Sequence, residues 1–90
     1  MLETTLTIVN RLGLHARAAG KFVNLSKTFS SEIYLTREGE AVDGKSIMSV
    51  MLLAAPLGSK IDLRVVGDDE EQAFAELKEL VDDGFGERDD

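Results

Sequence analysis

Residues 60–65 alternate strictly between charged and apolar side chains, and this pattern constrains the fold more than any other in the chain. Alternation with a period of two is typical of a strand that buries one face and exposes the other. A sheet with a single apolar face needs a second layer to cover it. The charged residues are Lys60, Asp62 and Arg64, and the apolar residues are Ile61, Leu63 and Val65.

The rest of the chain predicts three more strands and three helices. Alternating or β-branched segments predict the strands, and apolar stripes at helical spacing predict the helices. We expect strands over residues 4–9, 32–36, 40–43 and 60–65, and helices over 16–27 and 47–54. A final helix, capped by Asp68 or Asp69, should run to near Gly84. The order is βαββαβα. It predicts an α+β fold, a two-layer open-faced sandwich with a four-stranded antiparallel sheet and three helices on one face.

The length and composition indicate one small domain. Ninety residues with 43% hydrophobic content are enough for a single modest core over residues 1–90. We expect a frayed tail from about residue 85 to 90. The chain has no cysteine, which excludes disulfides and thiolate metal sites. We see no signal peptide, and the longest near-apolar run, 47–57, is shorter than the roughly 20 residues of a membrane span. We therefore expect a soluble, cytoplasmic protein.

The charge distribution separates the first third of the chain from the rest. The net charge of −7 argues against nucleic acid as a partner. Residues 1–30 nevertheless hold four basic residues and one acid, a net charge of +3. We therefore expect any anion-handling site to lie in this third.

The single histidine, His15, lies where a loop meets a predicted helix. Histidine is not a favoured helix cap, but the unpaired amides of a helix start bind anions. Their positive field favours a neutral, nucleophilic ring, and Arg17 offers a guanidinium fork to phosphoryl oxygens. Gly13 lets the loop bend. The alternative is an ordinary surface histidine. A metal site is disfavoured, since there is no second histidine and no cysteine.

Two motifs extend this interpretation. The run 12–17, Leu-Gly-Leu-His-Ala-Arg, resembles the active-site motif of the HPr family, the histidine phosphocarriers of the bacterial phosphotransferase system. The run 44–51, Gly-Lys-Ser-Ile-Met-Ser-Val-Met, resembles that family's second signature. Chain length, element order and the spacing of the motifs also agree, so the resemblance covers essentially the whole chain.

The resemblance implies a stoichiometric carrier that is not an enzyme and needs no cofactor. It implies that enzyme I, using phosphoenolpyruvate, phosphorylates His15 on Nδ1 and that the group then passes to a IIA domain for sugar uptake and regulation. Arg17 then stabilises the phosphoryl group, together with the backbone amides of Ala16 and Arg17. Many family members have proline after this arginine, where this chain has Ala18. Alanine removes some rigidity from the first helical turn but blocks no chemistry.

Ser46 precedes the apolar run that begins at Ile47, and two interpretations of it stay open. A serine in this place is what helix capping requires. The resemblance matches Ser46 instead to a regulatory serine, which HPr kinase phosphorylates in some members.

The helix after Ser46 is too apolar to have only one buried stripe. We expect Val50, Leu53 and Ala54 to face the sheet. The second arc is either core or an exposed docking patch, which the resemblance assigns to enzyme I and IIA domains. It comprises Ile47, Met48, Met51 and Leu52.

Two other functions remain open. One is a nitrogen-related or regulatory member of the same family, whose targets include transcriptional regulators. The other is a protein-binding module in which His15 transfers nothing. We expect a monomer in each case, and the sequence does not identify a sugar or a IIA partner.

Overall fold

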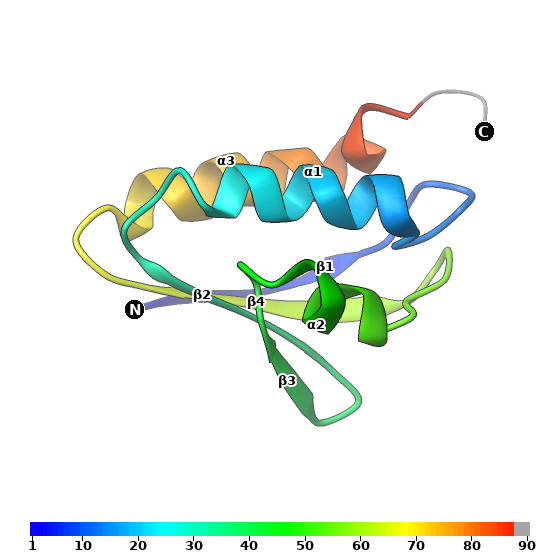
Figure 1. The fold of residues 1–90 in the computed structure, drawn as a ribbon, viewed down its shortest axis with the longest axis horizontal. Coiled ribbons are helices and arrows are strands. Elements are labelled where there is room, and N and C mark those ends of the chain that lie inside the picture. The colour runs from blue at the N-terminus through cyan, green and yellow to red at the C-terminus, as the bar shows by residue number, and fades with distance from the viewer. Residues whose placement is uncertain (88–90) are drawn as a thin grey trace.

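The chain forms a four-stranded antiparallel sheet with helices packed on one face, as expected (Figure 1). The structure is a computed structural model and describes residues 1–87. The strands are β1 (Leu2–Thr7), β2 (Glu32–Arg37), β3 (Glu40–Asp43) and β4 (Lys60–Val66). The helices are α1 (Ala16–Ser26), α2 (Ile47–Leu52), α3 (Glu70–Asp82) and the short 3-10 helix η1 (Gly84–Gly86).

Strand β4 lies between β1 and β2, so the sheet order is β1-β4-β2-β3. Leu63 at its centre pairs with Thr4 of β1 and with Leu35 of β2. The predicted alternation is confirmed, since Ile61, Leu63 and Val65 are buried while the charged residues between them are exposed. The sheet therefore buries one face along its central strand.

Helices α1 and α3 lie side by side over that buried face (Figure 1). Burial of each large apolar side chain contributes about 1.5–3 kcal/mol to folding. Leu25 of α1 and Leu80 of α3 are only partly buried and pack against the edge of the core. The apolar residues that the two helices bury are Ala18, Ala19, Phe22, Val23, Ala73, Leu77 and Val81. Among residues 1–87, no helix is both long enough and apolar enough to cross a bilayer.

Some predicted boundaries are wrong by two residues. The first strand occupies Leu2–Thr7, not 4–9, because it pairs along its length with β4. Helix α2 ends at Leu52. Ala54 adopts a φ of +47°, which a right-handed helix does not allow, and its side chain is exposed instead of facing the sheet.

Asp69 occupies the N-cap position of α3, but its side chain does not cap the helix as predicted. Instead, one carboxylate oxygen accepts a hydrogen bond from Ser30 N at 2.9 Å, and the other accepts from Ser31 N and Ser31 Oγ. The hydroxyl of Ser31, with the two amides, lowers the pKa of the Asp69 carboxyl to about 2. The carboxylate thus joins the start of α3 to the loop after α1.

The segment after α3 returns to the body of the protein. The frayed tail expected from about residue 85 is wrong for Phe85 to Glu87, because the Phe85 ring is buried and Glu87 contacts His15. The remaining part of that expectation, residues 88–90, lies outside the described residues. A buried aromatic side chain explains why a segment this short has a defined place.

The Asp69 contact predicts a pH-dependent stability. Asp69→Asn weakens all three hydrogen bonds, so we expect a lower melting temperature than wild type at neutral pH. A depressed pKa stabilises the fold above the pKa of the unfolded carboxyl, about 4. That stabilisation is lost as the pH falls through about 2. Melting curves from neutral pH to pH about 2 should therefore converge for the two proteins. Asp68→Asn, next to it and exposed, is the control; a gap that stays constant with pH contradicts the assignment.

Candidate functional site

His15 is the N-cap residue of α1, as predicted, with an extended backbone and no capping hydrogen bond from its side chain. The first helical hydrogen bond runs from Ala19 N to His15 O at 2.8 Å. The amides of Ala16, Arg17 and Ala18 precede it, so they have no carbonyl partner within the helix. The ring, 26% exposed, therefore lies at the positive end of the α1 dipole with access to solvent.

The loop before His15 rests directly on the loop after α2. Leu14 N donates a hydrogen bond to Ala55 O at 2.8 Å. Gly13 has a φ of +69°, and a Cβ there would lie 2.6 Å from Ala55 O and 2.9 Å from Pro56 Cα. Only glycine fits this close approach. The bend that the sequence predicted at Gly13 is therefore also a packing contact that places His15.

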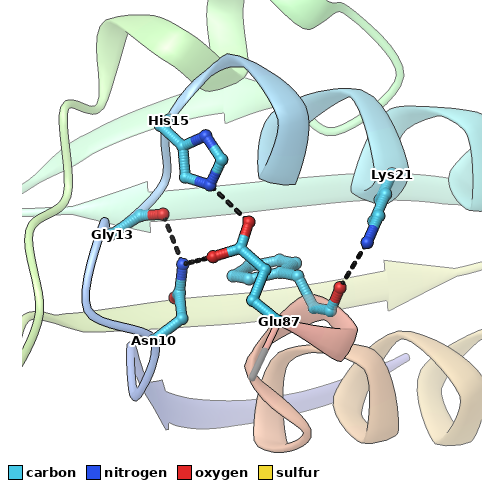
Figure 2. A network of polar contacts seen from close by, with 6 residues as sticks. Asn10, Gly13, His15, Lys21 and Glu87 are labelled. Atoms are coloured by element: carbon cyan, nitrogen blue, oxygen red, sulfur yellow. Dashed lines mark hydrogen bonds and ion pairs between the residues drawn. The ribbon is translucent and has the colours of Figure 1, made fainter. Parts of the chain in front are cut away.

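A polar network connects the ring to the segment after α3 (Figure 2). The His15 Nε2 atom contacts one carboxylate oxygen of Glu87. The Asn10 amide donates to the other oxygen at 2.9 Å and to Gly13 O at 2.7 Å. Burial raises the pKa of the Glu87 carboxyl, but the hydrogen bonds from Asn10 and His15, together with nearby positive charge, outweigh it and leave that pKa below its usual value.

Two contacts hold Glu87 in this network. The Phe85 ring is buried, and the Lys21 ammonium donates to Phe85 O at 2.8 Å (Figure 2). The sequence prediction missed both Asn10 and Glu87. One signal was present, since Phe85 lies between Gly84 and Gly86 directly after a helix. An aromatic residue between two glycines there favours a return of the chain onto the core.

Arg17 lies in the first turn of α1, two residues after His15, and its side chain is exposed. The structure gives its guanidinium no hydrogen bond or ion pair within residues 1–87. Its position is compatible with the expected role.

Ser46 caps α2, as one of the two interpretations required. Its backbone is extended and its Oγ accepts a hydrogen bond from Ser49 N at 3.4 Å. The other interpretation, modification of the hydroxyl, stays a prediction.

The second arc of α2 is exposed and is not core. We call it the apolar patch: Ile47 (42% exposed), Met48 (71%), Met51 (40%) and Leu52 (79%). Val50 and Leu53 on the opposite side are buried, as expected. The patch adjoins α1, because Ile47 Cδ1 lies 3.8 Å from the position of a Cβ on Gly20. Gly20 is only five residues after His15, about 7.5 Å along the helix axis.

Comparison with known proteins identifies the family. The family described as PTS HPr component phosphorylation site matches residues 2–83. The phosphocarrier protein HPr of Cupriavidus necator is 47% identical over 87 residues, 97% of this chain and 98% of that protein. This chain belongs to the HPr family. HPr proteins are phosphocarriers of the phosphotransferase system and by family are not catalytic enzymes.

Solved HPr structures share the fold. HPr-C-His from Thermoanaerobacter tengcongensis superposes with a TM-score of 0.94 and 42% identity, covering 98% of this chain and 99% of that one. An HPr dimer from the same organism has a TM-score of 0.77, 42% identity and coverage of 97% and 100%. The expectation of a monomer therefore stays untested. The family match contains His15, Ser46 and the apolar patch but ends before Glu87.

The close packing at Gly13 can be tested against a glycine of the same conformation. Gly39 has a φ of +85°, and a Cβ on it would have no atom within 4 Å, so Gly39→Ala carries the left-handed backbone penalty alone, about 1–2 kcal/mol. Gly13→Ala adds the collision with Ala55 and Pro56. We expect it to lower the free energy of unfolding, measured in urea, by at least about 1 kcal/mol more than Gly39→Ala. Equal losses contradict the packing role.

Proposed function

We propose that this protein carries a phosphoryl group on His15, receiving it from enzyme I and passing it to a IIA domain in the service of sugar uptake and regulation. The observation that supports this most is the position of the ring: a partly exposed imidazole at the positive end of α1, beside unpaired amides and Arg17. Family membership and the absence of a second histidine in the chain point to the same residue.

The transfer needs one bond made and one broken. The lone pair of His15 Nδ1 attacks phosphorus, and the bond from phosphorus to the donor nitrogen of enzyme I breaks, with its electron pair leaving on that nitrogen. The amides of Ala16 and Arg17 and the Arg17 guanidinium stabilise negative charge on the phosphoryl oxygens. Passage to a IIA histidine is the same step in reverse.

The apolar patch is the proposed docking surface for both partners. Four large apolar side chains exposed on one short helix are unusual on a monomeric surface and are typical of an interaction site. The two methionines, Met48 and Met51, adapt their side chains to surfaces of different shape. One patch beside one phosphoryl site therefore suits a carrier that meets two partners in turn.

Ser46 is the proposed regulatory site of this surface. A phosphoryl group there adds about −1.5 to −2 charge at the N-terminus of α2, which the free amides and the helix dipole tolerate. The same charge lies next to Ile47 and Met48, where docking requires desolvation. We therefore expect modification by an HPr kinase to hinder docking while leaving the fold intact.

Two alternatives to this function can be distinguished by phosphoryl-transfer assays. A nitrogen-related or regulatory paralogue accepts the phosphoryl group but serves other targets. A pure binding module accepts none. Incubation with enzyme I and phosphoenolpyruvate distinguishes a carrier, which becomes phosphorylated, from a binding module, which does not. Transfer onward to sugar-specific IIA domains distinguishes a sugar-transport carrier from a nitrogen-related or regulatory paralogue.

His15→Ala is expected to fold normally and to accept no phosphoryl group from enzyme I, because no other imidazole exists in the chain. Acid-labile, base-stable radiolabel measures phosphohistidine, and circular dichroism checks the fold. Wild-type labelling of the variant removes His15 from the mechanism.

Met48→Glu is expected to weaken binding to both enzyme I and a IIA domain by about 10-fold or more, because a charge must then be desolvated on docking. Met48 is 71% exposed, so the melting temperature should stay close to wild type. Ala41→Glu adds the same charge at another exposed position, on β3, and serves as the control. Titration calorimetry that gives both variants the wild-type affinity contradicts the docking role.

A further inference from the structure

The Glu87 carboxylate contacts Nε2 of the only histidine in the chain (Figure 2). We propose that Glu87 is a positioning residue: it holds the proton of the neutral His15 ring on Nε2, so that Nδ1 carries the lone pair that takes the phosphoryl group. This inference rests on the proposed function and adds a residue to it. Glu87 lies outside the family match, which ends at residue 83.

The chemistry of the contact determines which nitrogen carries the proton. An ionised carboxylate can only accept hydrogen bonds, so a neutral imidazole facing it must donate. Hydrogen bonds from Asn10 and His15, together with nearby positive charge, outweigh burial and keep the Glu87 pKa below its usual value, so the carboxylate is ionised at neutral pH. The donor is Nε2–H, and the lone pair is then on Nδ1.

The orientation of the carboxylate is determined by Asn10. The Asn10 amide nitrogen donates to Gly13 O at 2.7 Å and to Glu87 Oε1 at 2.9 Å. Both of its protons are thereby used, and the contact with Gly13 excludes a flipped amide, because two oxygens would then face each other. Glu87 Oε2 is therefore directed at His15, and only 5% of the Glu87 side chain is exposed.

The segment that carries Glu87 is itself held in place. Phe85 is buried at 1% exposure, and its carbonyl accepts from Lys21 of α1 at 2.8 Å. Phe85 has a φ of +59°, a left-handed conformation that costs a non-glycine residue about 1–2 kcal/mol. Burial of the ring offsets this cost. Phe85 thus anchors the segment two residues before Glu87.

The carboxylate also acts during the transfer. As Nδ1 bonds to phosphorus, the ring gains positive charge, and Nε2–H keeps its proton while its hydrogen bond to Glu87 strengthens. No proton has to leave the site, and the electron pair of the broken bond stays on the nitrogen of the donor. The helix amides act on the phosphoryl oxygens and Glu87 acts on the other ring nitrogen.

Glu87→Gln provides a sharp test, because the network predicts an inverted ring. Asn10 still needs an acceptor, so the oxygen of the introduced amide takes that place and its NH₂ group faces Nε2. An NH₂ group can only donate, so the ring proton moves to Nδ1 and the nucleophilic lone pair is lost there. Glu87→Ala removes the contact without imposing either tautomer. We therefore expect wild type to be phosphorylated fastest, Glu87→Ala more slowly and Glu87→Gln slowest. The rate of Glu87→Gln should be at least about 10-fold below that of wild type.

Two measurements separate this inference from the proposed function. Nitrogen-15 NMR of the neutral ring reports directly which His15 nitrogen carries the proton and needs no partner. Phosphoryl transfer is measured with phosphoramidate, a small donor that needs no docking, and the product nitrogen is identified by the same NMR experiment. Glu71→Gln, an exposed glutamate at the opposite end of α3, is the matched control and should behave as wild type.

The outcomes are distinct. A proton on Nε2 in wild type and on Nδ1 in Glu87→Gln, with the expected order of rates, supports the inference. A proton on the same nitrogen in both proteins overturns it, as does Glu87→Gln reacting faster than Glu87→Ala, the order expected if the isosteric side chain mattered only for packing. Melting temperatures exclude unfolding as the cause. A wild type that accepts no phosphoryl group from phosphoramidate or enzyme I, whatever its tautomer, overturns the proposed function itself.

Discussion

The loop before α1 lies on the backbone of the loop after α2, and the site depends on this contact. Leu14 N binds Ala55 O, and Gly13 lacks the Cβ that would separate the two loops. Below them, Ile8 continues the antiparallel association of β1 with β4 through hydrogen bonds to Gly58 and Ser59. The sheet, the start of α1 and the end of α2 are therefore joined at one place, and His15 extends from it.

Opposite fields act on the two sides of the His15 ring. The ring lies at the positive end of α1, and the Glu87 carboxylate lies at its Nε2 atom (Figure 2). The amides favour an added anion, while a carboxylate near the same ring limits how strongly that anion is held. A carrier has to hold a phosphoryl group and also release it. In the proposed function, the balance of these fields meets both needs without a deep pocket.

The apolar patch and His15 belong to adjacent helices, so in the proposed function one small surface serves both docking and transfer. Ile47 lies against α1 at Gly20, where its Cδ1 atom is 3.8 Å from the position that a Cβ would take. Val50 and Leu53 anchor α2 to the core from its other side. The short helix is thus held firmly enough to present large apolar side chains to a partner, although these side chains gain nothing from burial in the isolated protein.

Local patterns in the sequence determined much of this protein. The alternation at Ile61, Leu63 and Val65 predicts a half-buried strand, and the apolar stripes around Phe22 and Leu77 predict helices. In each case the spacing of the apolar residues matches the repeat of the backbone, so these side chains share one face that can be buried. His15 at a helix start and Ser46 at a cap were equally visible, since both depend only on their neighbours in sequence.

Tertiary structure alone decided the strand order, the contact of Asp69 with Ser30 and Ser31, and the place of Glu87 beside His15. Asp68 or Asp69 was predicted as a local cap because the sequence cannot show which distant amides compete for the Asp69 carboxylate. Glu87 is separated from His15 by 72 positions, and the packing of Phe85 with the contacts of Lys21 and Asn10 brings them together. A hydrogen bond forms only when the donor–acceptor distance lies within a range of a few tenths of an ångström. Such distances are properties of the folded chain and not of residue order.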